Sequence, residues 1–219
     1  MIDETLEPLV LAIAGGSCSG KTILSRLIHE RLGTTDSVYL QLDRYYKPVR
    51  IKNDTQMDLP NFDHPEALDL TLFEQHVAAL KQGQSIQAPI YDFAAHRRQE
   101  HTEAITPKPF IVLEGHLLLH DPQLRELYDL SCYIECNEHI RLERRITRDL
   151  EQRGRSEESV RQQFEQTVAP MHNQFVSPSK THAHLVIAQE RYCSSTDALV
   201  DSILAELKGH DVPTARAAL

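Results

Sequence analysis

Residues 15–22 read Gly15-Gly16-Ser17-Cys18-Ser19-Gly20-Lys21-Thr22 and fit the phosphate-binding loop pattern G-x-x-x-x-G-K-S/T. An unbroken apolar run, residues 9–14, precedes the loop and has the length of a buried parallel strand. After the loop, apolar residues recur at helical spacing as far as Leu32, and Gly33 is a candidate C-cap. The loop should therefore join a buried strand to a helix N-terminus. That context distinguishes a nucleotide site from an ordinary glycine-rich turn.

The chemistry expected of this loop follows from its residue types. Glycines let the backbone take positive φ angles and bring consecutive N–H groups close to an anion. The start of the helix adds unpaired N–H donors and the positive end of the helix dipole. Lys21 is expected to reach the β- and γ-phosphates, and the Thr22 hydroxyl is expected to ligate Mg²⁺. The residues predicted to bind the nucleotide are Gly15, Gly16, Ser17, Cys18, Ser19, Gly20, Lys21 and Thr22.

Bulk properties restrict the partners and the compartment. The chain has 219 residues and a net charge of −9, which argues against nonspecific binding to nucleic acid through a basic surface. No stretch approaches the length of a membrane span, and the first residues lack a signal-peptide pattern. The four cysteines show no C-x-x-C spacing. We therefore expect a cytoplasmic protein without nucleic-acid or membrane partners.

Strand-like and helical stretches alternate along most of the chain. This rhythm predicts an α/β fold with a five-stranded parallel sheet and helices on both faces. Residues 85–105 interrupt the rhythm, being short, strand-like and rich in turn residues, and we interpret them as an inserted β-hairpin with its bend near residues 92–98. After the phosphate loop, the further strands are expected near residues 37–42, 110–115, 130–135 and 184–187.

Two carboxylates follow predicted strands, at the edge where ligands bind in open α/β sheets. Asp43 is placed to take a proton from an acceptor hydroxyl, and Glu114 to hold Mg²⁺ directly or through water. A turn aspartate and a strand-end acid without a role are the alternatives, weakened by the neighbouring phosphate loop. The candidate magnesium ligands are Thr22, Asp43 and Glu114.

Arginines concentrate in one later helix of this acidic chain. Phosphoryl transfer spreads negative charge over the moving group, and the forked donors of arginine neutralise such charge. We expect Arg141 and Arg144 to lie on a solvated face, paired with acids such as Asp149. Gly154 offers a hinge for a closing lid. The arginines assigned to catalysis are Arg145, Arg148, Arg153 and Arg155.

The predicted hairpin carries aromatic and polar side chains suited to a planar ligand. Aromatic faces stack on a base, and a histidine or tyrosine tip can hydrogen-bond its edge. Taken singly, each aromatic residue is more often part of a core. The 12 histidines show no metal-ligand spacing, so a zinc-type site is not expected. The residues concerned are Tyr91, Phe93 and His96 on the hairpin, with Phe62 and Asp63 on another loop.

These motifs together resemble the uridine kinases (uridine-cytidine kinases) of the P-loop kinase superfamily. The resemblance runs in family order over roughly residues 9–187. One departure is His116, which follows Glu114 and Gly115 where an apolar residue is usual. The matching stretches are residues 15–22, 42–46, 61–65, 91–97, 113–115, 144–149 and 153–155.

The resemblance implies phosphorylation of the 5′-hydroxyl of uridine or cytidine by ATP or GTP with Mg²⁺, in a homo-oligomer. It implies one kinase domain over residues 1–219, with an acceptor-binding hairpin at 84–106 and a helical lid region at 141–170. Other acceptors of the superfamily (ribulose 5-phosphate, nicotinamide riboside or pantothenate) and a non-catalytic nucleotide-binding regulator are the alternatives.

The resemblance also implies individual roles. Asp43 would be the base, and Asp63 and Arg145 would bind the ribose. The pyrimidine would be held by Tyr91, Phe93 and His96, with Phe62 and Gln163 nearby, and the phosphates would be bound from the lid by Arg148, Arg153 and Arg155.

Overall fold

A parallel sheet forms the centre of the protein, for which we obtained a computed structural model. The structure describes residues 7–48, 51–53, 56–57, 61–93, 95–189 and 195–209. The sheet has five strands in the order β2-β7-β1-β8-β9, all parallel, which confirms the predicted sheet. The strands are β1 (Leu9–Gly15), β2 (Ser37–Gln41), β7 (Phe110–Glu114), β8 (Leu130–Glu135) and β9 (Leu185–Ala188).

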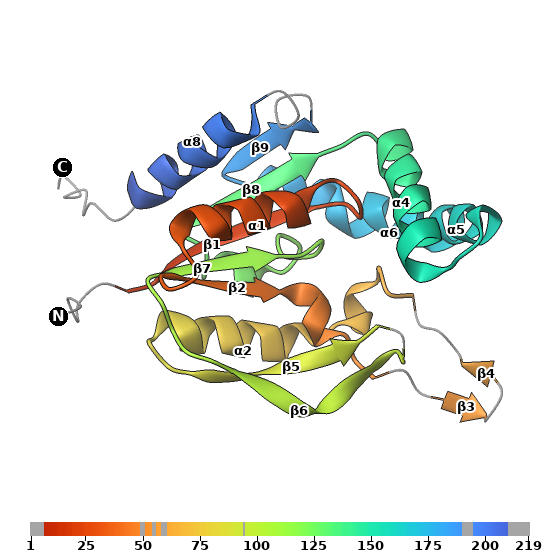
Figure 1. Ribbon diagram of the computed structural model, residues 1–219, viewed down its shortest axis with the longest axis horizontal. Helices are drawn as coiled ribbons and strands as arrows, with labels where there is room; N and C mark the ends of the chain where they lie inside the picture. Colours follow the sequence, from red (N-terminus) through yellow and green to blue (C-terminus); the bar gives the residue numbers. More distant parts are fainter. Residues whose placement is uncertain are drawn as a thin grey trace.

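Both faces of the sheet are covered, because the central strand β1 is apolar on both sides. Leu11 and Ile13 pack in the core beneath α1 (Lys21–Leu32) and α8 (Thr196–Gly209). Val10 and Ala12, which alternate with them, pack in the core on the opposite face, beneath α2. Helices α1 and α8 thus pack on one face of the sheet and α2 (Leu70–Lys81) on the other, which is the doubly wound arrangement expected from the sequence (the three helices are labelled in Figure 1).

The predicted hairpin is present as a separate two-stranded sheet of β5 (Ile86–Asp92) and β6 (Arg97–Ile105). It lies beyond α2 (Figure 1), and its bend includes His96 at a φ of 50°. Ala94, within the predicted bend, lies outside the described residues. The smaller elements are η1 (Leu42–Tyr45), β3 (Ile51–Asn53), β4 (Gln56–Met57), η2 (Pro65–Ala67) and α3 (Pro122–Arg125).

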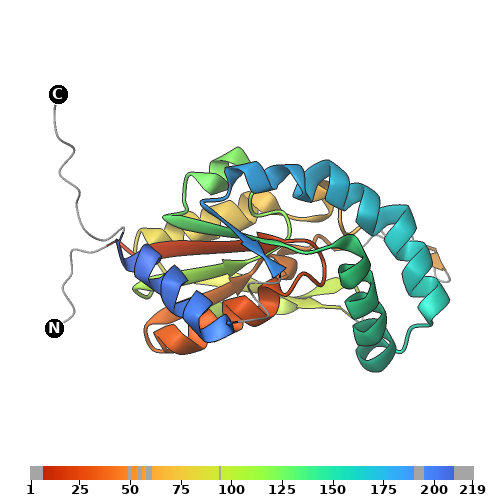
Figure 2. The ribbon, with the colours of Figure 1, turned by 90° about the horizontal axis from the view of Figure 1, so that it is seen from above.

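A helical arm projects at the end of the sheet where the strands finish (Figure 2). Helix α4 (Glu138–Arg153) ends at Gly154, which takes the left-handed conformation with φ 60°. Ser156 then caps α5 (Glu157–Gln163), accepting a hydrogen bond from the Ser159 N–H, as its position before an acidic first turn predicts. The segment continues through π-helical turns at Phe164–Val168 and His172–Val176 around α6 (Ala169–Met171), and ends in η5 (Pro178–His182).

Candidate active site

The phosphate loop has the backbone geometry of an anion cradle. Gly15 and Gly20 have φ angles of 149° and 105°, and Cys18 has a φ of 61°. The Ser19 N–H donates to the Gly16 carbonyl (3.1 Å), which closes a tight turn. Lys21 and Thr22 are the first two residues of α1, whose N-terminus has no side-chain cap. The free N–H groups of that first turn are therefore available to an anion.

Gly16 lies against the helical arm with no room for a side chain. A Cβ atom there would lie 2.8 Å from Arg141 Nη1 and 2.9 Å from His172 Cε1. We expect Gly16→Ala to push the loop off its supports and weaken ATP binding by roughly tenfold, in line with the cost of overpacking. Equilibrium titration with ATP measures this. Gly209→Ala, at the end of α8 with no atom within 4 Å of the added Cβ, is the control. Equal ATP affinity in the two variants would contradict the prediction.

Arg141 corrects one expectation from the sequence. It was expected on a solvated face, but it is only 1 % exposed and lies beneath the phosphate loop. Its Nε donates to the Cys136 carbonyl (3.3 Å), and its guanidinium lies 5.7 Å from the Phe164 ring centroid. Within the described part of the chain, its Nη1 has no hydrogen-bond partner. Arg144 is partly exposed and contacts Cys136 Sγ at 3.9 Å. Helical spacing placed both arginines on one face but did not show what covers it.

Glu114 lies at the end of β7 and is held by three donors. Lys21 Nζ lies 3.5 Å from its Oε1, while Tyr39 Oη and Gln41 Nε2 donate to its Oε2 at 3.1 and 3.0 Å. The Glu114 side chain is 3 % exposed and that of Lys21 is 10 % exposed. The buried ion pair holds the lysine at the phosphate loop.

Asp43 lies in η1, directly beyond β2, and faces the same space. Its Oδ1 is enclosed without a hydrogen-bond partner among the described residues. Burial, followed by the charge of Glu114, raises the pKa of Asp43 to about 6, against the opposing effect of Lys21, Arg153 and Arg148. The side chain as a whole is 41 % exposed, so the carboxylate remains accessible from the space around the phosphate loop.

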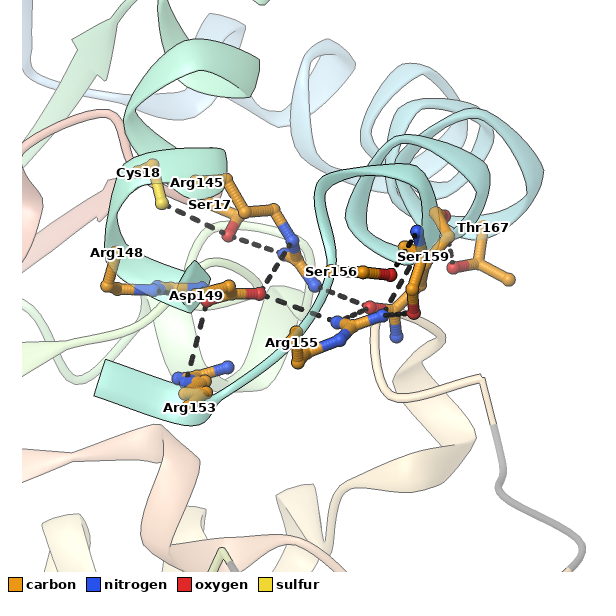
Figure 3. A network of polar contacts seen from close by, with 11 residues as sticks. Ser17, Cys18, Arg145, Arg148, Asp149, Arg153, Arg155, Ser156, Ser159 and Thr167 are labelled. Atoms are coloured by element: carbon orange, nitrogen blue, oxygen red, sulfur yellow. Dashed lines mark hydrogen bonds and ion pairs between the residues drawn. The ribbon is translucent and has the colours of Figure 1, made fainter. Parts of the chain in front are cut away.

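The four arginines assigned to catalysis gather around one buried acid (Figure 3). Asp149, on α4, is completely buried, although the sequence suggested a solvated partner. Its Oδ1 accepts from Arg148 Nε at 2.8 Å and lies 3.6 Å from Arg153 Nε. The reversal at Gly154 brings Arg155 back, so that its Nη1 lies 3.4 Å from Asp149 Oδ2. Arg145 completes the arginine cluster (Arg145, Arg148, Arg153 and Arg155), with its Nε 3.7 Å from Oδ2.

Arg145 also joins the helical arm to the phosphate loop. Its Nη1 donates to Ser17 Oγ at 2.9 Å, and its Nη2 donates to Gln163 Oε1 at 3.1 Å (Figure 3). Gln163 also accepts from Arg155. The structure therefore brings together the loop, the arginine cluster and Gln163, which the resemblance had assigned to the neighbourhood of the pyrimidine.

Aromatic side chains from three segments meet beside Asp43. The Phe62 and His96 rings stack at 5.1 Å with an interplanar angle of 24°, and Tyr46 packs edge-on against Phe62 at 5.4 Å. Tyr91 lies 5.5 Å from Tyr46, and its buried hydroxyl has no partner among the described residues. Phe93 contacts Tyr91 but is 53 % exposed at the hairpin bend, so most of its surface faces outward.

Two arginines tie the hairpin to the segment that carries Asp43. Arg98, on β6, donates to the carbonyls of Tyr45 (2.9 Å) and Tyr46 (3.0 Å). Arg44, next to Asp43, donates to the Pro89 carbonyl at 2.9 Å. Asp63 reaches the same space, because its charge acts on both Tyr46 and the neighbouring His116. The aromatic cluster (Tyr46, Phe62, Tyr91, Phe93 and His96) and Asp43 are thus parts of one connected unit.

Comparison with known proteins shows the family to which this chain belongs. The sequence matches the Phosphoribulokinase / Uridine kinase family over residues 10–195. The chain belongs to this family. It is 40 % identical over 196 residues to the uridine kinase of Ligilactobacillus salivarius, covering 86 % of this chain and 89 % of that protein. It is 41 % identical over 183 residues to the uridine kinase of Bacillus pumilus, covering 84 % and 87 % of the two chains.

The fold has counterparts among solved structures of the kinase family. The phosphoribulokinase of Rhodobacter spheroides superimposes with a TM-score of 0.62 at 14 % identity, covering 83 % of this chain and 70 % of that one. This likeness supports the P-loop kinase fold. No helix in the described parts of this chain is long and apolar enough to span a membrane. Among the same residues, no three histidine, cysteine or acidic side chains are grouped so as to hold a metal ion by themselves.

Proposed function

We propose that this protein is a uridine kinase that transfers the γ-phosphoryl group of ATP to the 5′-hydroxyl of uridine or cytidine. The observation that carries the proposal is the setting of Asp43, whose carboxylate interacts with Lys21 of the phosphate loop and with Tyr46 of the aromatic cluster. An enclosed carboxylate oxygen without a partner there is suited to receive the proton of an acceptor hydroxyl. Relatives about 40 % identical over most of the chain carry the name uridine kinase.

Asp43 acts as the general base in this proposal. It accepts the proton of the 5′-hydroxyl as the oxygen forms a bond to the γ-phosphorus, and the bond from that phosphorus to the bridging oxygen of ADP breaks. The negative charge that ADP gains is met by Lys21 and the N–H groups of residues 15–22. The raised pKa of Asp43 suits this role, because a base with a pKa closer to neutrality both accepts and releases a proton readily.

Mg²⁺ is part of the proposal because the residues present suit it. Magnesium prefers oxygen ligands from one or two carboxylates together with phosphate oxygens. Asp43, through the carboxylate oxygen that does not take the hydroxyl proton, and the Thr22 hydroxyl would supply such ligands, and Glu114 would act directly or through water. When bound, the ion would neutralise charge on the phosphates.

The arginine cluster and the aromatic cluster complete the assignments. Arg148, Arg153 and Arg155 would contact the phosphates, and the helical lid region at residues 141–170 would close over them around Gly154. Asp63 and Arg145 would bind the ribose. The pyrimidine would lie against Tyr91, Phe93 and His96, with Phe62 and Gln163 nearby.

The proposal also covers the domain organisation, the phosphate donor, the oligomeric state and the compartment. We infer a single kinase domain over residues 1–219, in which the hairpin at 84–106 serves acceptor binding. GTP is an alternative donor to ATP. The protein would be a homo-oligomer of the cytoplasm.

An ADP-release assay with a panel of acceptors tests the proposed function. With MgATP, uridine or cytidine should stimulate ADP release at least tenfold over the acceptor-free rate. Ribulose 5-phosphate, nicotinamide riboside and pantothenate should have no effect. A response to one of these three instead would overturn the acceptor assignment. ATP binding without turnover on any acceptor would indicate a nucleotide-binding regulator.

A further inference from the structure

His116 is a buried histidine beside Asp43 to which the proposed function assigns no role. It lies directly beyond β7, two residues after Glu114, and is 7 % exposed. Its Nδ1 lies 3.9 Å from Asp43 Oδ1. The ionisable groups that act on it are Asp63, Lys21 and Glu114, and His172 on the helical arm is a further neighbour.

The His116 ring can donate a hydrogen bond in this setting. A neutral imidazole carries a proton on one ring nitrogen, and the other nitrogen is an acceptor. The carboxylate facing Nδ1 favours the tautomer with the proton on that atom. Nδ1–H therefore points a donor toward the oxygen that would receive the proton of the acceptor.

The gap between His116 and Asp43 has the size of one bridging oxygen. At 3.9 Å, the two atoms are too far apart for a direct hydrogen bond. An oxygen placed ~2.8 Å from both would join them at roughly a right angle. Asp43 Oδ1 is enclosed and lacks a hydrogen-bond partner among the described residues. Buried polar groups are rarely left unpaired, so this oxygen, with His116 Nδ1 facing it, marks a place where a ligand hydroxyl can bind.

We propose that His116 is an acceptor-contact residue whose Nδ1–H donates a hydrogen bond to the hydroxyl that becomes phosphorylated. The hydroxyl would donate its own hydrogen to Asp43 and accept one from His116, which fixes the oxygen in front of the γ-phosphate. The proton on Nδ1 stays in place during the reaction, and Asp43 alone receives the hydroxyl proton. The inference rests on the proposed function and adds a specificity contact to it.

Three substitutions of His116 distinguish a role in hydrogen bonding from a role in packing. In His116→Asn the amide nitrogen can take the place of Nδ1, whereas in His116→Gln it takes the place of Nε2. His116→Leu fills the space with an apolar side chain and removes both ring nitrogens. His184→Leu is the matched control, because His184 contacts Ser131 at the starts of β8 and β9, away from the strand ends that form the site. Thermal unfolding of each variant establishes that it is folded.

A binding cycle with uridine and 5′-deoxyuridine supplies the decisive measurement. Calorimetry gives the ratio of the affinity for uridine to the affinity for 5′-deoxyuridine. This affinity ratio should fall about 3- to 10-fold in His116→Leu and His116→Gln, which corresponds to the loss of one hydrogen bond. The ratio should be largely kept in His116→Asn and unchanged in His184→Leu. In kinetics, KM for the nucleoside should rise while KM for MgATP stays constant.

The outcomes distinguish this inference from the proposed function. If uridine is phosphorylated but the affinity ratio of uridine to 5′-deoxyuridine is the same in wild type and His116→Leu, the contact is refuted and the kinase assignment stands. Equal losses in His116→Asn and His116→Leu would show that the ring only fills space, which also refutes the contact. If the acceptor panel identifies another substrate, the cycle uses that substrate and its deoxy analogue, and the same criteria decide. If no acceptor is found, both proposals fail.

Discussion

Asp43→Asn is expected to lower kcat by ~10²–10⁴-fold, because the amide cannot accept the proton of the attacking hydroxyl. The substitution preserves the shape of the side chain, so folding and the binding of MgATP should change little. Steady-state kinetics with uridine and a separate titration with an ATP analogue measure the two quantities. A nucleotide-binding regulator would show no such loss. Unaltered turnover in the variant would remove Asp43 from the mechanism.

The pH dependence of the wild type provides the control for this substitution. Burial and Glu114 raise the pKa of Asp43 to about 6 in the free enzyme. Below that pH the carboxyl group keeps its proton and cannot serve as the base, so kcat/KM should fall by about one decade per pH unit as the pH decreases. It should level off above that pH. Asp43→Asn should lack this acidic limb, and a profile that rises toward low pH would contradict the assignment.

Asp149→Asn should have the second large effect, because it removes the acid that, among the described residues, pairs with all four arginines of the cluster. Asp149 is completely buried, and its charge faces all four guanidinium groups. Breaking a buried ion pair by removing one partner costs about 3–5 kcal/mol. For a chain of this size, that corresponds to a decrease in Tm of roughly 10 °C. KM for MgATP should also rise, since the arginines would repel one another away from their places around the phosphates.

Glu157→Gln is a matched control for Asp149→Asn. It removes the same charge from the same helical arm, but Glu157 forms an exposed pair with Arg161 at helical spacing. Such pairs contribute little to stability, so Tm and KM should remain at the wild-type values. Equal behaviour of the two variants in calorimetry and kinetics would show that Asp149 does not organise the arginine cluster.

The sequence predicted the elements of this protein better than the contacts between them. The phosphate loop, the five strands, the hairpin and the helix break at Gly154 follow from local patterns: apolar runs, glycine positions and capping residues. These patterns depend on neighbouring residues, which the sequence shows directly. The sheet then brings the strand ends together, so the meeting of Asp43, Glu114 and Lys21 could also be expected.

The side chains that local patterns misplaced are those whose surroundings come from distant segments. Arg141 and Asp149 have the spacing of a solvated helix face, but the phosphate loop covers the first and the turn after Gly154 returns Arg155 to the second. One signal was available for Asp149, which lies four residues from both Arg145 and Arg153. Tyr46 is recognised as part of the aromatic cluster only from its contacts with Phe62 and Tyr91, which no spacing in the sequence indicates.

The attachment of the hairpin through Arg44 and Arg98 has a consequence for how this architecture can diversify. The hairpin is an independent two-stranded sheet, fixed to the turn that carries Asp43 and outside the central sheet that presents the phosphate loop. In the proposed function, recognition of the small molecule and binding of the triphosphate would therefore be separable modules. Changes at the tip, where Phe93 is exposed, would then alter substrate choice without changing the residues that transfer the phosphoryl group.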